Sequence, residues 1–265
     1  MSLTLPTFLI VGAAKSGTSS LWHYLREHPE VYVPKRKEVD FFNDDDRFAL
    51  GAAWYADFFA RGAGKKALGE ASPSYLFSEV AGSRMAEIVP SARLVMILRN
   101  PIDRAYSHFL HARYYTLEQR SFREVVEEER AAPEGRRWPY YLAQSRYLPQ
   151  LQRLMKSFPR EQALILLLDD LIAEPVSMFK TLCEHVRIDP SIVPSIVGDA
   201  TNTYRESRAA PLMRRLITPM MGNRVPWLIR RPFLRLTTRS GRTPPPIDPG
   251  IRRELAEYFA QDNED

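Results

Sequence analysis

The sequence predicts an α/β fold with a central parallel β-sheet. Short, continuous apolar runs alternate along the chain with longer segments in which apolar residues recur at helical spacing. This alternation is typical of parallel strands joined through helices. The chain has 265 residues, of which 45% are hydrophobic and 26% charged. It therefore has the composition of an ordinary globular protein and is long enough for one large domain or two small ones.

The expected strands are four apolar runs, at 8–11, 31–33, 94–98 and 163–168. The first is followed by a helix at 19–27, in which Leu21, Trp22 and Leu25 share one face and after which Pro29 stops the helix. The other expected helices are at 102–114, 122–130, 146–157, 175–186 and 249–260. The sequence contains no internal repeat, and we expect a single domain over 1–265.

One segment, 205–242, differs from the rest because it is rich in arginine and contains Glu206 as its only acidic residue. We expect an irregular insertion or lid here rather than a second domain. Three functional interpretations are a mobile lid over a bound ligand, a docking surface for an acidic carrier protein, and an amphipathic membrane contact, since apolar residues alternate with Arg214 and Arg215. The alternative is a packed subdomain with salt-bridged arginines.

Charge and cysteine content narrow the class of protein. The formal net charge of +5 fits either ordinary surface charge or an anionic ligand. The sequence has no aromatic-interleaved basic motif of the RNA-binding kind, so we expect no nucleic-acid partner. Cys183 is the only cysteine, which fits a reducing compartment, and we expect a cytoplasmic protein. The run 7–11 is too short to span a membrane, so we expect neither a signal peptide nor a transmembrane helix.

The stretch GAAKSGTSS, at 12–20, directly follows the first expected strand. A glycine-framed loop before a helix presents backbone N–H groups to an anion, and it is a suitable site for one phosphate. Lys15 precedes Gly17, whereas in the nucleotide P-loop the lysine follows the second glycine. Lys15 can therefore reach past a bound phosphate to the atom beyond, while Thr18, Ser19 and Ser20 add hydroxyl donors. The alternative interpretation is an ordinary strand–helix turn.

A second phosphate site is predicted in LRNPIDRAYSHF, at 98–109. Arg99 ends a buried strand, and Ser107 lies two turns into the next helix, so the two side chains can hold one phosphate between them. A kinase or ATPase would instead need a magnesium ligand, typically an aspartate, at such a strand end. Two phosphate sites with a lysine reaching beyond one of them fit 3′-phosphoadenosine 5′-phosphosulfate (PAPS).

These motifs resemble those of a known family. FLIVGAAKSGTSSL resembles the 5′-phosphosulfate loop of PAPS-dependent sulfotransferases, and LRNPIDRAYSHF resembles their 3′-phosphate motif. The resemblance is strongest to the heparan-sulfate-type and related bacterial enzymes. KEVDFF, GEASPSYL, FPREQALILLLDDL and GRTPPPIDP extend it, so that it runs from about residue 8 to residue 259. It implies a P-loop-like, three-layer fold with a central parallel sheet, and PAPS as co-substrate without a metal.

The resemblance also implies roles for single residues. Lys15 would stabilise the leaving oxygen, and Glu38 would be the catalytic base, with Lys35 and Lys37 pairing with it or binding an anionic acceptor. Asp40, Ser72 and Tyr75 would contact the acceptor, although Glu70, Ser72 and Tyr75 fit turn chemistry equally well. The residues expected to bind the nucleotide are Ala14, Lys15, Ser16, Gly17, Thr18, Ser19, Arg99, Ser107, Gly241 and Arg242.

Two departures from the family concern the acceptor. Asp40 stands where the heparan sulfate enzymes commonly have histidine, and Ala71 stands where they have lysine, which argues against a heparan-like acceptor. If Glu38 and Asp40 lie on a strand they share a face, and Asp40 could then replace Glu38 as base. A catalytic base at His108 or His111 is a further alternative. The run of three aspartates at 44–46 is expected to be a solvated turn.

The sequence thus predicts transfer of a sulfonate from PAPS to an acceptor hydroxyl or amine. A P-loop kinase that uses ATP and Mg²⁺, or a catalytically silent nucleotide-binding scaffold, is the alternative. The acceptor remains open between a small molecule, a glycan, a lipid and a carrier-bound chain. The oligomeric state and a peripheral membrane contact remain open as well.

Overall fold

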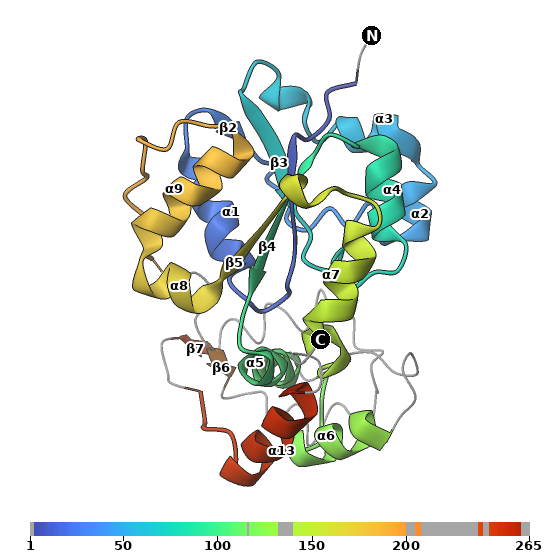
Figure 1. Cartoon of the computed structure of the whole chain (residues 1–265), viewed down its shortest axis with the longest axis vertical. Coiled ribbons are helices and arrows are strands. Elements are labelled where there is room, and N and C mark those ends of the chain that lie inside the picture. Colours follow the sequence, from blue (N-terminus) through green and yellow to red (C-terminus); the bar gives the residue numbers. More distant parts are fainter. Residues whose placement is uncertain are drawn as a thin grey trace. The chain divides into compact units, whose positions relative to one another are not determined.

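The computed structural model describes residues 3–115, 117–131, 140–199 and 244–260, together with the backbone of two short strands, β6 (Arg205–Ser207) and β7 (Thr238–Ser240). The chain forms two compact units, coloured along the sequence in Figure 1. Unit 1 comprises 1–99 and 147–201, and unit 2 comprises 100–146 and 202–265. The expectation of a single domain over 1–265 stays a prediction.

Unit 1 is built on a five-stranded, wholly parallel sheet with the strand order β2-β3-β1-β4-β5. This arrangement confirms the predicted α/β class. The strands are β1 (Phe8–Gly12), β2 (Val31–Tyr32), β3 (Ala67–Ala71), β4 (Arg93–Leu98) and β5 (Ala163–Leu167). β3 was not predicted, because its sequence ALGEA contains a glycine and a charged residue and does not read as an apolar run.

Helices cover both faces of this sheet and give the expected three layers (Figure 1). Side chains along β1 point alternately to the two faces of the sheet. Phe8 and Ile10 pack against the helices on one face, and Leu9 and Val11 pack against those on the other. The first face carries α1 (Thr18–Glu27), α8 (Leu168–Ala173) and α9 (Pro175–Val186). The second carries α2 (Asp45–Phe48), α3 (Gly51–Ala56), α4 (Ala81–Ile88) and α7 (Tyr147–Met155), with the 3₁₀ turns η1 (Ala60–Gly62) and η3 (Arg160–Gln162) elsewhere in the unit.

The predicted helices in the described ranges are all present, and their ends differ from the predicted ones by at most two residues. The unpredicted helices are α2, α3, α4 and α8, which are four to eight residues long. Such short helices complete too few turns to show a helical period in the sequence. The expected strand at 163–168 ends at Leu167, because Leu168 is already the first residue of α8.

The strand order creates a switch point between β1 and β4. The chain leaves β1 through α1 toward β2 at one edge of the sheet, and after β4 it returns to the sheet at β5 on the other edge. In open parallel sheets, ligands bind at the carboxyl ends of the strands beside such a point. The GAAKSGTSS loop follows β1 and Arg99 follows β4, so the fold places this loop and the strand-end arginine, both predicted to bind phosphate, at this edge.

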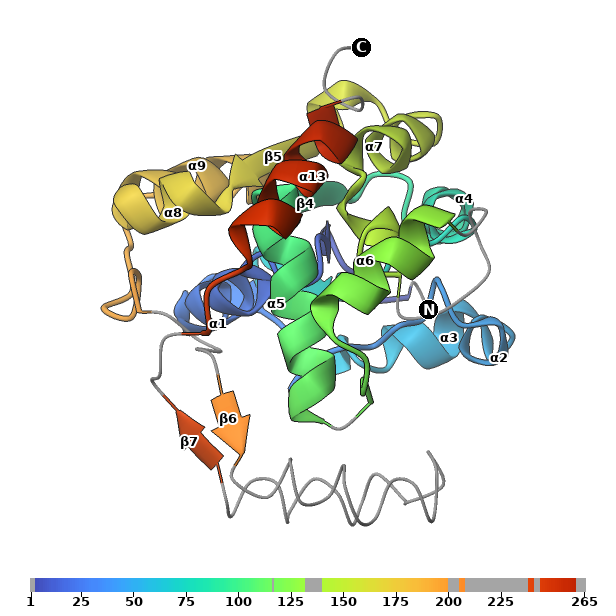
Figure 2. The same cartoon turned by 90° about the horizontal axis from the view of Figure 1, so that it is seen from below.

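Unit 2 is a small helical cluster, seen from below in Figure 2. It contains α5 (Pro101–Tyr114), α6 (Phe122–Ala131), α13 (Pro249–Ala260) and the 3₁₀ turn η2 (Ala143–Ser145), which surround an apolar core that includes Phe109, Phe122 and Leu255. β6 pairs with β7 in antiparallel register. Most of the arginine-rich segment 205–242 lies outside the described residues, and so do Gly241 and Arg242.

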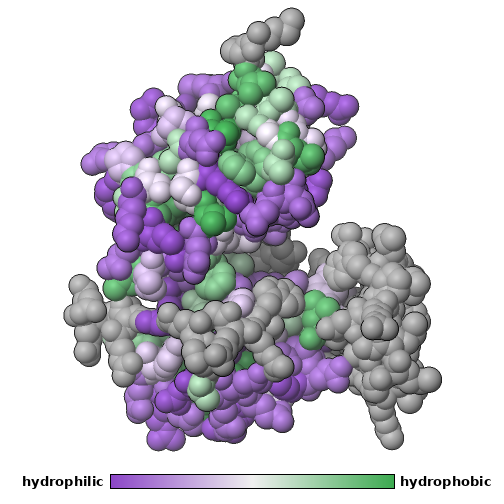
Figure 3. Space-filling view, turned by 90° about the vertical axis from the view of Figure 1, so that its right-hand side faces the viewer, coloured by the Kyte–Doolittle hydropathy of each residue, from purple (hydrophilic) through white to green (hydrophobic). Residues whose placement is uncertain are grey.

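Among the coloured residues on the face that Figure 3 shows, hydrophilic ones predominate and apolar ones form groups between them. In the part of the chain that the structure describes, none of the helices is both long enough and apolar enough to span a lipid bilayer. The cytoplasmic location stays a prediction.

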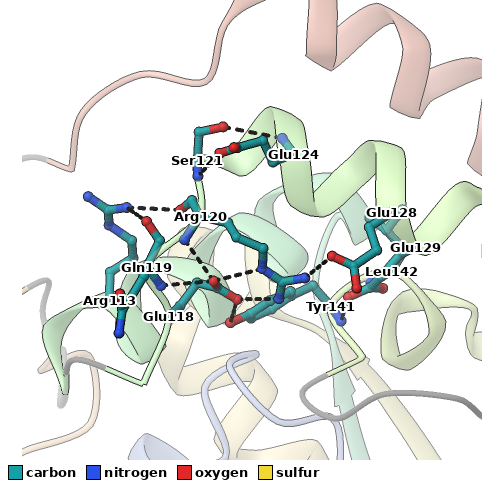
Figure 4. A network of polar contacts seen from close by, with 10 residues as sticks. All are labelled: Arg113, Glu118, Gln119, Arg120, Ser121, Glu124, Glu128, Glu129, Tyr141 and Leu142. Carbon is teal, nitrogen blue, oxygen red and sulfur yellow. Dashed lines mark hydrogen bonds and ion pairs between the residues drawn. The ribbon is translucent and has the colours of Figure 1, made fainter. Parts of the chain in front are cut away.

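A buried carboxylate, Glu118, organises the polar side of unit 2 (Figure 4). Its side chain is 4% exposed and accepts hydrogen bonds from Arg120 Nε at 2.9 Å and Arg120 Nη2 at 2.6 Å. Tyr141 Oη donates to it at 3.1 Å, and Arg120 also pairs with Glu128. Burial by itself raises the pKa of Glu118, but the hydrogen bonds and charge of Arg120 outweigh it and hold the pKa below the ordinary value.

Replacing this carboxylate tests how much the network contributes. Because the folded-state pKa is lowered, the ionised group stabilises the fold above the ordinary pKa of 4.5, and this contribution is lost as the pH falls through the folded-state value. We expect Glu118→Gln to lower the free energy of unfolding at neutral pH by about 2–4 kcal/mol. The difference in the free energy of unfolding between wild type and Glu118→Gln should become smaller at acid pH, as measured by urea denaturation over a pH series. Glu127→Gln, at a side chain 62% exposed, is the control; an equal loss in both variants would contradict the prediction.

Candidate active site

The loop between β1 and α1 is shaped by its two glycines. Gly12 packs against Leu76 so closely that an added Cβ would lie 2.6 Å from the Cβ of that leucine. Gly17 is the N-cap of α1 and has φ 100°, a left-handed conformation that glycine adopts at little cost. As Gly17 has no capping side chain, the N–H groups of Thr18 and Ser19 have no acceptor within the helix. Lys15 also has a left-handed backbone, with φ 71°.

This loop fits an oxyanion. Ser16 is fully buried, and its Oγ has no hydrogen-bond partner among the described residues. A buried hydroxyl without a hydrogen-bond partner lowers the free energy of unfolding by about 1–3 kcal/mol. An oxygen of a phosphate bound at the N-terminal end of α1 would be a suitable acceptor for Ser16 Oγ. The start of α1 also attracts negative charge through the helix dipole. The predicted phosphate loop therefore has the uncapped helix end and the orphaned hydroxyl that such a site needs.

Arg99 lies beside the same loop. Its Nη1 donates to the carbonyl of Lys15 at 3.5 Å, and its own carbonyl accepts a hydrogen bond from Tyr147 Oη at 2.9 Å. The first phosphate loop and the end of β4 are thus in contact, as the strand order requires. Ser107 lies in α5 of unit 2 and is half-buried, and its phosphate-binding role stays a prediction.

Lys37 links the loop to Glu38. Its Nζ donates to Ser19 Oγ at 3.0 Å and lies 3.5 Å from Glu38 Oε1, with side-chain exposures of 16% for Lys37 and 42% for Glu38. Partial burial raises the pKa of Glu38, Lys37 opposes this rise, Asp40 adds to it, and Lys15 also opposes it; the net direction is upward. Lys37 therefore connects the predicted phosphate loop to Glu38, the predicted base.

Asp40 is not placed as the sequence predicted. β2 ends at Tyr32, so Glu38 and Asp40 do not lie on a strand, and Asp40 has a left-handed backbone with φ 53°. The expected alternation was therefore wrong. Asp40 Oδ1 accepts a hydrogen bond from Ser74 Oγ at 2.8 Å, and Oδ2 lies 3.4 Å from Arg47 Nη1. Asp40 thus has a cation and a hydroxyl as partners.

Glu38 and Asp40 nevertheless open into the same pocket, which has a volume of about 630 Å³. Its lining is strongly acidic and consists of Glu38, Asp40, Asn43, Asp44, Asp45, Asp46, Arg47 and Ser74. Across the described ranges, no group of three or more His, Cys, Asp or Glu side chains is arranged to hold a metal ion. The sequence predicts a solvated turn at 44–46, whereas in the structure Asp44 caps α2, whose first residues are Asp45 and Asp46.

Two of the predicted acceptor residues are inside the protein. Ser72 is 0% and Tyr75 1% exposed, and their hydroxyls donate to Glu70, which is itself 1% exposed. They also hold the backbone next to Glu38, because Ser72 Oγ accepts from the N–H of Asp40 and Tyr75 Oη accepts from the N–H of Phe41. This burial corrects the expectation that Ser72 and Tyr75 face an acceptor. The alternative bases His108 and His111 lie in α5 of unit 2.

Comparison with known proteins shows the family of this chain. Residues 43–191, more than half of the chain, match the model of the sulfotransferase family. The chain therefore belongs to the sulfotransferase family.

Among individual proteins, the chain is similar to human bifunctional heparan sulfate N-deacetylase/N-sulfotransferase 3, with 29% identity over 98% of the chain and 29% of that protein. It is also similar to human bifunctional heparan sulfate N-deacetylase/N-sulfotransferase 2, with 32% identity over 70% of the chain and 22% of that protein. The chain thus spans less than a third of the length of these relatives. A solved sulfotransferase from Alicyclobacillus acidocaldarius has 28% identity and a TM-score of 0.71, over 97% of this chain and 92% of that one.

The electrostatics of Glu38 can be tested in the free protein. We expect NMR titration of isotopically labelled glutamate side chains to give Glu38 a pKa above 4.5. Lys37→Met should raise this pKa further, since it removes a cation that favours the carboxylate, and Asp40→Asn should lower it, since it removes a repelling charge. Lys35→Met, which removes the charge of an exposed lysine nearby, should have a smaller effect. An ordinary or lowered pKa, or equal responses to both lysine variants, would contradict this account.

Proposed function

We propose that this protein transfers a sulfonate from PAPS to an acceptor hydroxyl or amine. The observation that carries the proposal is Lys37, which connects a loop that fits a phosphate to Glu38: its Nζ donates to Ser19 Oγ at 3.0 Å and lies 3.5 Å from Glu38 Oε1. The same chain belongs to the sulfotransferase family, which supports the reaction type. The donor and the acceptor are inferred from the residues of the site.

On the donor side, PAPS carries a sulfonate bonded to an oxygen of its 5′ phosphate. This phosphate is already a good leaving group when the bond between sulfur and oxygen breaks. The N–H groups at the start of α1, with Ser16, Thr18 and Ser19, would bind the 5′ phosphate. Lys15 would neutralise the negative charge that develops on the oxygen between phosphorus and sulfur as its bond to sulfur breaks. Arg99 would bind the 3′ phosphate. Ser107, Gly241 and Arg242 stay predictions for the same nucleotide.

On the acceptor side, Glu38 would take the proton from the hydroxyl or amine as the new bond to sulfur forms. The products are the sulfonated acceptor and 3′,5′-ADP, and the acceptor proton is left on Glu38. A raised pKa suits this role, because a base whose conjugate acid is weaker holds the transferred proton better. Asp40 is a poorer candidate, since Arg47 and Ser74 already engage both of its oxygens.

Binding and turnover together test the proposal. We expect 3′,5′-ADP to raise the melting temperature without added metal, and more than ATP with Mg²⁺ does. Lys15→Ala should reduce kcat severely with 3′,5′-ADP affinity within about tenfold of wild type, since the lysine acts mainly on the leaving oxygen. Glu38→Gln should reduce kcat by about 10²–10⁴ with donor binding unchanged. Turnover is measured with radiolabelled PAPS and an acceptor found by screening sugars, phenols and amines.

The alternatives predict different results. A P-loop kinase would be stabilised more by ATP with Mg²⁺ than by 3′,5′-ADP. A silent scaffold would bind 3′,5′-ADP and transfer no sulfonate to any acceptor. Wild-type turnover in Lys15→Ala would contradict the assigned catalytic role. Asp40→Asn is the matched control for Glu38→Gln, and a larger loss in Asp40→Asn would move the base to Asp40.

The charge of the pocket bears on the acceptor. Its lining carries five carboxylates and one arginine, so an acceptor with negative groups near its reacting atom would be repelled. We therefore propose an acceptor that is neutral or positively charged around the reacting hydroxyl or amine. This differs from a polyanionic sugar chain, in agreement with the absence of the family's histidine and lysine at Asp40 and Ala71.

A pair of oligosaccharides of opposite charge tests this preference. We expect oligomers of glucosamine to be sulfonated with a higher kcat/KM than oligomers of galacturonic acid. Asp46→Asn should reduce the preference by about two- to fivefold, the range expected for an exposed charge. Asp57→Asn makes the same change at an exposed aspartate outside the pocket and should leave the ratio unchanged. Preference for the anionic oligomer, or equal effects of both variants, would contradict the proposal.

A further inference from the structure

Glu70 is a carboxylate at the end of β3 with almost no access to water. Three hydroxyls surround it: Tyr55 Oη and Tyr75 Oη donate to Oε1, each at 2.7 Å, and Ser72 Oγ donates to Oε2 at 2.7 Å. Tyr55 and Tyr75 are 0% and 1% exposed. A buried carboxylate is tolerated only when hydrogen bonds replace its water, and these three hydroxyls do so.

Two of the three hydroxyls have a second partner. The N–H of Asp40 donates to Ser72 Oγ at 3.0 Å, and the N–H of Phe41 donates to Tyr75 Oη at 2.9 Å. A hydroxyl has one proton and two lone pairs, so each of these groups can give its proton to Glu70 while it accepts an amide proton. An ionised Glu70, which only accepts hydrogen bonds, therefore orients Ser72 and Tyr75 as acceptors for the backbone. Tyr55 has no such backbone partner in the network.

The backbone that they hold belongs to KEVDFF, the segment that carries Glu38. Val39, Phe41 and Phe42 are 0% exposed, and the ring of Phe41 stacks on that of Tyr55 with centroids 4.5 Å apart. Arg47 Nη1 donates to the carbonyl of Val39 at 2.6 Å. The chain on the C-terminal side of Glu38 is thus fixed by burial and by hydrogen bonds, whereas the side chain of Glu38 itself is 42% exposed.

We infer that Glu70 is a positioning residue for the proposed base: through Ser72 and Tyr75 it fixes the Asp40–Phe41 backbone and so holds Glu38 beside Lys37. The inference rests on the proposed function for its catalytic consequence, but the positioning itself is a property of the free protein. Neither Glu70 nor its hydroxyls touch the reacting atoms. Their effect is transmitted through the two amides.

The three hydroxyls provide a matched test. Tyr75→Phe and Tyr55→Phe each remove one hydroxyl that donates to Glu70 Oε1, but only Tyr75→Phe also removes an acceptor of a backbone amide. We expect hydrogen exchange of the Phe41 N–H to accelerate about tenfold in Tyr75→Phe, and that of the Asp40 N–H about tenfold in Ser72→Ala, the loss of one hydrogen bond. Tyr55→Phe should leave both amides within about twofold of wild type.

Glu70→Gln keeps the shape of the side chain but replaces one acceptor oxygen with an N–H donor. The hydroxyl that donates to this oxygen then loses its acceptor and is no longer oriented toward the backbone. Hydrogen exchange of the Asp40 and Phe41 amides should therefore accelerate. If this variant does not fold, the hydroxyl variants still decide the question. With an acceptor in hand, Tyr75→Phe and Ser72→Ala should lower kcat about tenfold at unchanged KM for PAPS, and Tyr55→Phe should retain the wild-type kcat.

The inference would be overturned if Tyr55→Phe and Tyr75→Phe gave equal amide exchange rates at Asp40 and Phe41 and equal kcat. Glu70 would then contribute only to the packing of the protein interior. Failure of the proposed function looks different. In that case, the wild-type protein fails to bind 3′,5′-ADP or to transfer sulfonate, while the exchange differences between Tyr55→Phe and Tyr75→Phe persist.

Discussion

A carboxylate cut off from water is the constraint around which the candidate site is built. Glu70 needs hydrogen-bond donors on both of its oxygens, and α3, the turn after β3 and the Glu38 segment are arranged to satisfy this need. Tyr55 comes from α3, and Ser72 and Tyr75 follow β3. The KEVDFF segment folds over these hydroxyls, because they offer acceptors to two amides that would otherwise be buried without partners. The hydroxyls that satisfy the buried carboxyl group thus also hold the chain beside Glu38.

Charge is segregated within unit 1. Lys15, Lys37 and Arg99 belong to or contact the loop at the start of α1, while the pocket that Glu38 helps to line consists mainly of carboxylates. Glu38 belongs to both regions, because it lines this pocket and also pairs with Lys37. Burial and Asp40 raise its pKa, whereas Lys37 and Lys15 oppose the rise. In the proposed reaction, the donor brings negative charge to the basic region and the acceptor enters from the acidic one. A base at this boundary can reach the acceptor without facing the phosphates.

Much of the fold followed from local patterns. The apolar runs of β1, β4 and β5 and the long helices were predicted, because continuous burial and helical periodicity are visible in the sequence. The segment proposed to carry the base is singled out only by its resemblance to a family, since KEVDFF by itself looks like a charged surface run. β3 and the short helices were missed, because ALGEA and four-to-eight-residue helices have no periodic signal. The strand geometry assumed for Glu38 and Asp40 was wrong, because Asp40 takes a left-handed backbone.

The sequence by itself determined the α/β class and the positions of the loop at 12–20 and of Arg99 directly after β1 and β4, since each depends on residues close together in the chain or at the ends of recognisable strands. Only the tertiary structure decided the roles of Glu70, Ser72 and Tyr75 and of the aspartates at 44–46. The physical reason is that a side chain's role depends on its burial and on its partners. Ser72 meets the amide of Asp40, which is 32 positions away, only after β3 has paired in the sheet and the KEVDFF segment has packed beside it.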